Sequence, residues 1–156
     1  MKNIIIISTI LFFCSIANAK ESTVYSFALA NNSDVHAYGY YKFGAHTGTV
    51  GTLRPGKAAH EGFMPFSVNV RTEIVFTCET TGDNEEVCAT AEVDLQKYLP
   101  KGKKYKYVET IFRLEKDKSI TLSFETEEIS KKVSTINIGK LPVTTGNPKA
   151  WVDRLR

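Results

Sequence analysis

Hydrophobic and polar side chains alternate with a period of two along much of this chain, most regularly between residues 66 and 79. One parity of that stretch is mostly apolar, and its apolar members are Phe66, Val68, Val70, Ile74, Phe76 and Cys78. Successive side chains of a β-strand point to opposite faces of its sheet, so the pattern predicts a half-buried strand. We expect the rest of the domain to be organised around it.

An acidic turn and a second apolar run follow this strand. Residues 80–86 contain Gly, Asp and Asn, which tolerate the positive φ angles of hairpin turns. The run from Val87 to Leu95 is again compatible with a strand. Because Cys78 and Cys88 lie one on each strand, the sequence predicts a hairpin closed by a disulfide.

The parity of the two cysteines predicts an irregularity in this hairpin. Cys78 belongs to the apolar face of its strand, whereas Cys88 has the opposite parity to the apolar residues around it, such as Ala89 and Val93. Two cysteines that face each other across an antiparallel pair must share a face. A β-bulge near Cys88 or Ala89 reconciles the two patterns.

Similar patterns predict further strands over residues 24–30, 35–43, 105–114, 119–126 and 131–140, and residues 60–64 form a short segment that ends at Pro65. Residues 44–51 form either a loop or a weak edge strand, and Asn147 followed by Pro148 starts a short C-terminal helix in which Trp151 and Leu155 share a face. Short strands with regularly spaced turns predict an all-β fold, a single-domain antiparallel β-sandwich, with a small β-barrel as the alternative.

Residues 1–19 have the pattern of a secretory signal peptide. Lys2 supplies the positive charge, residues 4–13 are apolar, and Ala17-Asn18-Ala19 fits a cleavage site. The apolar run is too short to cross a bilayer comfortably and no second candidate follows it, so no membrane span is expected. The predicted domain is therefore residues 20–156, in a periplasmic or secreted protein.

Composition adds little to this picture. Removing 19 of the 156 residues leaves 137, which is enough for one domain with a sizeable core. Lys2 is lost with the leader, so 19 basic and 17 acidic residues give a net charge of +2, and nothing calls for nucleic acid. Cys14 is lost as well, and export would carry Cys78 and Cys88 into an oxidising compartment.

The residues that often carry chemistry form no recognisable constellation in the sequence. His36, His46 and His60 lie in separate segments without ligand spacing, and no G-x-S-x-G motif is present. The acidic turn does not match a calcium-binding loop, and the predicted disulfide removes the free thiols. The sequence thus predicts no cofactor and no metal, and an enzyme is the minority interpretation.

Tyrosines concentrate on one predicted strand, where Tyr38, Tyr40 and Tyr41 precede Phe43. A two-layer sandwich buries one face of a strand, so an aromatic face is left toward solvent unless something covers it. Exposed tyrosines are typical of binding surfaces. The alternative is that the C-terminal segment around Trp151 covers this face.

A second candidate surface is the loop with Lys101, Lys103, Lys104 and Tyr105, where lysines and tyrosines mix. Such a mixture suits phosphates, anionic glycans or an acidic protein face. Lysines also protect solvated strand edges against aggregation, which is the alternative interpretation.

These features predict an exported, non-enzymatic binding module that acts through a protein partner, of the inhibitor, immunity-protein or accessory-subunit type. The partner includes the case of a second copy of the chain. A carbohydrate-binding module or a small secreted hydrolase is the alternative, with sugar on the tyrosines.

Overall fold

A computed structural model of the chain describes residues 23–64, 71–80, 85–99, 103–144 and 147–155. The predicted leader, the first half of the strand at 66–79 and Lys101 lie outside the described residues. The strands are β1 (Val24–Asn31), β2 (Ala37–Phe43), β3 (His46–Leu53), β4 (Lys57–Met64), β5 (Arg71–Glu79), β6 (Glu85–Asp94), β7 (Tyr105–Leu114), β8 (Ile120–Glu128) and β9 (Val133–Lys140). A 3₁₀ turn, η1 (Leu95–Lys97), follows β6, and a short helix, α1 (Lys149–Val152), ends the chain.

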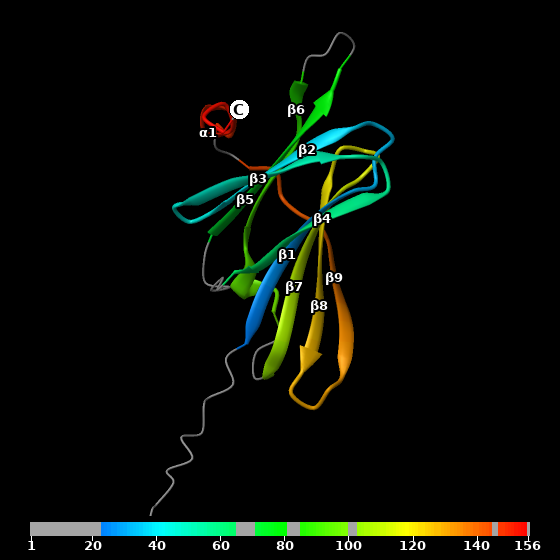
Figure 1. The fold of residues 1–156 in the computed structure, drawn as a ribbon, viewed down its shortest axis with the longest axis vertical. Helices are drawn as coiled ribbons and strands as arrows, with labels where there is room; N and C mark the ends of the chain where they lie inside the picture. Colours follow the sequence, from blue (N-terminus) through cyan, green and yellow to red (C-terminus); the bar gives the residue numbers. More distant parts are fainter. Residues whose placement is uncertain (1–22, 65–70, 81–84, 100–102, 145–146, 156) are drawn as a thin grey trace, which may run out of the picture.

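The strands form two sheets, one in the order β4-β1-β7-β8-β9 and one in the order β3-β2-β5-β6 (Figure 1). Over the described residues the sheets stay open and do not close into a barrel. The predicted all-β sandwich is therefore confirmed. Residues 44–51, predicted as a loop or an edge strand, fall largely in β3, at one edge of the smaller sheet.

One strand pair departs from the predicted antiparallel arrangement. β1 runs antiparallel to β4 on one side and parallel to β7 on the other, with Phe27 opposite Thr110. Side-chain alternation is the same in parallel and antiparallel strands, so the sequence pattern carried no information on this point. The other sheet pairs are antiparallel, including the predicted β7–β8 hairpin.

The main core lies between the sheets. Its largest fully buried side chains are Phe27, Phe76, Phe112 and Phe124, which come from β1, β5, β7 and β8. Full burial of one such side chain contributes about 1.5 to 3 kcal/mol. The predicted strand faces are thus the faces that pack together.

The disulfide and the bulge form as predicted. Cys78 and Cys88 are bonded, with their Cα atoms 5.7 Å apart. Phe76 pairs with Ala89 and Thr77 pairs with Val87, which leaves Cys88 as the extra residue of β6. The bulge turns the sulfur of Cys88 to the same face as Cys78, which resolves the parity conflict of the sequence.

The C-terminal helix is present, but it starts differently from the prediction. Pro148 occupies the N-cap position and no side chain caps the helix, so the predicted capping role of Asn147 is wrong. Backbone N–H groups of Trp151 and Val152 bond to the Pro148 carbonyl. Contacts of Trp151 with the smaller sheet, described below, hold the helix in place.

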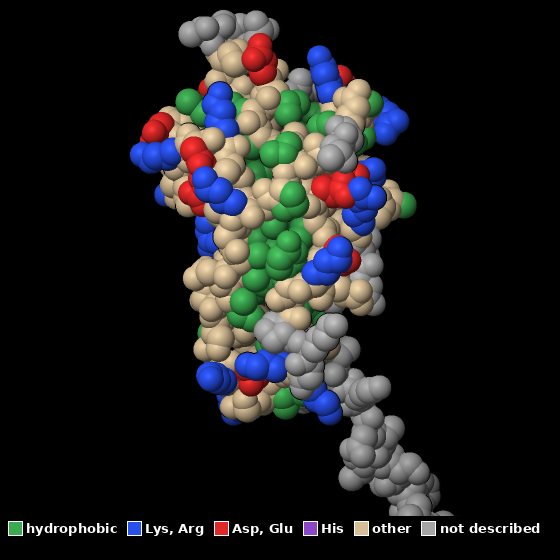
Figure 2. All heavy atoms as spheres, turned by 180° about the vertical axis from the view of Figure 1, so that it is seen from behind, with side chains coloured by type: hydrophobic (Ala, Val, Ile, Leu, Met, Phe, Trp, Pro, Cys, Tyr) green, Lys and Arg blue, Asp and Glu red, His purple; other side chains and the backbone are tan. Residues whose placement is uncertain are grey.

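The chain reaches α1 from β9, so it crosses from the larger sheet to the smaller one. Figure 1 shows α1 at the end of the molecule that holds β2, β3, β5 and β6. Seen from behind, apolar side chains form a continuous band down the middle of the surface, with charged side chains on both flanks (Figure 2). Apolar side chains on this face are therefore gathered rather than scattered.

Candidate functional site

The predicted tyrosine surface divides between the two faces of β2. Tyr41 and Phe43 point into the main core, where the ring of Tyr41 meets that of Phe27 edge-on at 4.7 Å between centroids. Burial raises the pKa of the Tyr41 hydroxyl. Tyr41 is therefore a core residue, and the expectation of an exposed face has to rest on Tyr38 and Tyr40.

Tyr38 and Tyr40 lie on the outer face of β2, and the C-terminal segment covers them. Tyr40 is only 4% exposed and forms a small cluster with Val75, Trp151 and Val152, against which Tyr38 packs. The covered alternative is confirmed, and the expectation of an exposed aromatic face is wrong. Tyr40 is buried and Tyr38 is partly buried, and a role of these tyrosines in binding stays a prediction.

One lysine of the predicted lysine surface is paired with a carboxylate. Lys103 bonds to Glu128 at 2.6 Å, which raises the pKa of the lysine and lowers that of the glutamate. Tyr105 is buried, and its hydroxyl has no hydrogen-bond partner among the described residues. Lys104 remains exposed, and Lys101 lies outside the described residues. No concentrated basic patch results from the residues that are described here.

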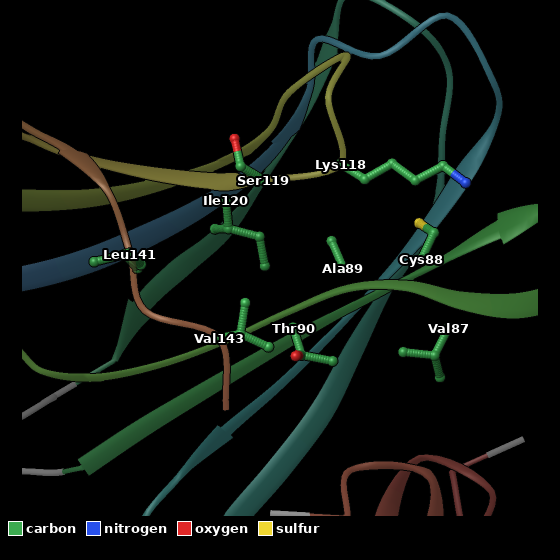
Figure 3. A pocket seen from close by; sticks show the side chains of 9 residues that line it. All are labelled: Val87, Cys88, Ala89, Thr90, Lys118, Ser119, Ile120, Leu141 and Val143. Carbon is green, nitrogen blue, oxygen red and sulfur yellow. The ribbon is translucent and has the colours of Figure 1, made fainter. Parts of the chain in front are cut away.

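A different feature, a cleft of about 260 Å³, lies between the edge of β6 and the start of β8. Its lining is mixed: Ile120 from β8 faces Ala89 and Val143 across the cavity (Figure 3), and Thr90 and Ser119 add polar groups. Lys118 extends over the rim, and Cys88 lies at one end. The bulge at Cys88 thus helps to form one wall of the cleft.

Burial differs sharply between the bottom and the rim of the cleft. Ile120 and Leu141 are buried, whereas Val143 is 73% exposed and Val87 is 39% exposed. Exposed apolar side chains at the border of a cavity are typical of interaction sites when they lie together. Val87 comes from β6 just before the bulge, and Val143 comes from the segment after β9.

The segment after β9 already occupies the part of the β6 edge at Glu92. After β9, Leu141 donates its N–H to the Ile120 carbonyl at 2.8 Å, and Glu92 of β6 donates its N–H to the Pro142 carbonyl at 3.4 Å. The Thr144 hydroxyl bonds to the Glu92 carboxylate at 3.3 Å. The residues of β6 that line the cleft, 87–90, precede this occupied part.

A polar groove on the outer face of the larger sheet is the second candidate. His60 of β4 and Glu109 of β7 meet above β1, with Nδ1 of the imidazole 2.8 Å from Oε1 of the carboxylate. Glu109 is only 8% exposed, and Oε1 also accepts a weak bond from Ser26 at 3.5 Å. The hydroxyls of Ser26 and Tyr107 are 2.8 Å apart.

Small side chains on β1 make this arrangement fit. Ser26, Ala28 and Ala30 alternate on the outer face, so the longer side chains of the neighbouring strands reach over them. The groove holds about 280 Å³ and has Ala28 and Ala30 in its lining, with Lys57, Arg113 and Glu125 among its polar groups. Small residues at alternate positions of β1 were the only sign of this site in the sequence. The site itself was not predicted from them.

The described residues bring no three His, Cys, Asp or Glu side chains together as metal ligands. The His60–Glu109 pair offers two ligand groups, whereas a zinc site usually has three or four protein ligands. In the described part of the chain, no helix has the length and apolar character that crossing a bilayer requires. Comparison of the chain with protein-family models, curated proteins and solved structures gave no match.

Proposed function

We propose that the chain is an exported, non-enzymatic binding module that acts through a protein partner, and that the cleft between β6 and β8 is its contact surface. The observation that carries the proposal is the exposure of Val143 at the rim of a cavity that also has the buried side chains of Ile120 and Leu141 in its lining. Burial of such side chains against a partner is favourable by about 25 cal/mol per Å² of apolar area.

The form of the cleft also supports a protein contact. Binding energy concentrates where an anchoring side chain enters a pocket that excludes water. The buried Ile120 and Leu141 supply such a pocket, and Lys118 at its rim offers a charge to an acidic group of the partner. The disulfide is compatible with an oxidising compartment, which supports export to the periplasm or the exterior.

A carboxylate placed in the cleft tests the proposal. We expect Val143→Asp to weaken binding of the partner at least about tenfold, because the carboxylate removes the apolar contact of Val143 and must lose water when the partner covers the cleft. The wild-type chain is immobilised, the protein that it retains in stoichiometric amount from extract of the source cells is purified, and its affinity for each variant is measured by calorimetry.

Val133→Asp is the matched control, because Val133 is 75% exposed and lies on β9 away from the cleft. We expect it to bind as the wild type does, and both variants to keep the wild-type melting temperature within the small range typical of surface substitutions. Equal weakening by the two variants, or no stoichiometric partner for the wild type, would contradict the proposal.

The polar groove on the larger sheet supports a second candidate, a carbohydrate-binding module. Two carboxylates, an imidazole and two cations line it, so its charges nearly balance, and alanine methyl groups form part of its floor. Balanced donors and acceptors beside an apolar surface suit the hydroxyls and the ring face of a neutral sugar. A hydrolase would use His60 as the base, with Glu109 orienting its ring.

A glycan array decides on this candidate. We expect any saccharide bound by the wild type to lose affinity at least about tenfold with Glu109→Gln, because the variant keeps the shape of the side chain but not its charge. Glu127→Gln, on β8 and paired with Lys106, is the control outside the groove. An array without signal for the wild-type chain would remove the candidate.

A further inference from the structure

We propose that the partner binds as an added β-strand: an extended segment of another protein pairs with β6 along residues 87–90 and places an aliphatic side chain in the cleft. This inference rests on the proposed function, and it specifies the chemistry of the partner. Its segment is extended, apolar at the position facing the cleft and polar at the flanking positions.

The position of β6 provides the backbone edge for such pairing. β6 pairs with β5 and is the last strand of its sheet in the described part of the chain. The N–H of Glu92 points away from β5, since it bonds to the Pro142 carbonyl. Backbone groups reverse direction at each residue, so Thr90 presents its N–H and carbonyl on the same side as Glu92.

The chain's own segment after β9 shows that this edge accepts an extended backbone. Residues 141–144 contact β6 at Glu92 through Pro142 and Thr144. Leu141 and Val143 of that segment line the cleft together with Thr90, Ala89 and Val87 of β6. An added strand would continue an existing contact along the same edge.

Side-chain geometry makes the cleft the specificity pocket of this contact. In a strand next to β6, every second side chain points to the inner face of the sheet, where Ala89 and Ile120 line the cavity (Figure 3). In strand addition, main-chain bonds supply affinity and such pockets select the side chains. Lys118 at the rim favours an acidic group next to the inserted side chain.

The occupied part of β6 argues against a second copy of this chain as the occupant. Two β6 strands paired antiparallel around residues 88–89 would bring Glu85 or Glu86 of one copy to Glu92 of the other, where the Glu92 N–H already bonds to the Pro142 carbonyl. The segment that contains Pro142 would block this pairing. The added strand is therefore expected to come from a different protein.

Removal of one backbone donor tests strand addition. Thr90→Pro lacks the outward N–H, and proline is tolerated on edge strands where that group does not serve the sheet. We expect Thr90→Pro to bind the purified partner at least tenfold more weakly than Thr90→Val does, because the valine variant keeps the N–H. An unchanged circular dichroism spectrum confirms that each variant folds.

Hydrogen exchange provides the second measurement, and it needs no substitution. We expect the Thr90 amide of the wild-type chain to exchange at least tenfold more slowly when the partner is bound. Unchanged exchange at Thr90, or unchanged affinity of a folded Thr90→Pro, would overturn strand addition. If Val143→Asp still abolished binding, the cleft would remain the contact surface and the proposed function would stand.

Discussion

Replacement of both Cys78 and Cys88 by serine is expected to lower the free energy of unfolding by about 2 to 3 kcal/mol. The bond closes a loop with a sequence separation of 10, so its loss gives the unfolded chain more freedom than it gives the folded one. Two hydroxyl groups would also replace sulfur beside Ala89, at the end of the cleft. The β5–β6 hairpin is the element that loses its constraint.

Urea unfolding followed by circular dichroism measures this effect. The wild-type protein under reducing conditions serves as the control, because it lacks the bond but keeps both sulfur atoms. We expect it to lose nearly as much stability as the double variant. A loss below about 0.5 kcal/mol in both proteins would show that the disulfide is incidental to the hairpin.

Trp151→Ala is expected to lower the free energy of unfolding by about 3 kcal/mol, near the lower end of the range for buried aromatic side chains. The indole is buried against Tyr40 and Val75, and its N–H donates to the Glu73 carboxylate at 3.1 Å. Glu73 also accepts a bond from Lys42 at 3.1 Å, so the carboxylate keeps one partner. The lost burial therefore accounts for most of the effect.

The same urea titration measures the Trp151 variant. Arg154→Ala, an exposed position in the same segment, is the control and should change the free energy by less than about 0.5 kcal/mol. In the Trp151→Ala protein, Tyr40 should also become accessible to nitration, since the helix no longer covers it. Wild-type stability of Trp151→Ala would mean that α1 contributes nothing to the outer face of β2.

The predicted and proposed binding surfaces differ because the prediction used the local pattern of each strand, whereas the surfaces depend on contacts between distant segments. The alternation of β2 places Tyr40 on the outer face of the sheet. Trp151, more than a hundred residues later in the sequence, buries it there. The cleft likewise combines β6, the start of β8 and the segment after β9. The alternation of side chains within each strand does not indicate which residues, far apart in the sequence, become neighbours at Tyr40 or in the cleft.

The sequence by itself determined most of the strands, the side chains they bury and the disulfide-linked hairpin, whereas it left β3 open and did not identify β4 as a strand. It even indicated the bulge at Cys88. Two bonded cysteines must lie on the same face of the sheet, and the sequence shows which residues of a strand share a face. These features follow from the alternation of side chains along an extended backbone and from the preferences of turn residues.

Only the tertiary structure decided which strands become neighbours. It placed β1 parallel to β7, brought His60 to Glu109 across β1, laid α1 over Tyr40 and, among the described residues, left part of the β6 edge without a paired strand. The physical reason is that burial constrains each strand separately, whereas strand order depends on packing between segments far apart in the chain. The candidate sites lie where such segments meet.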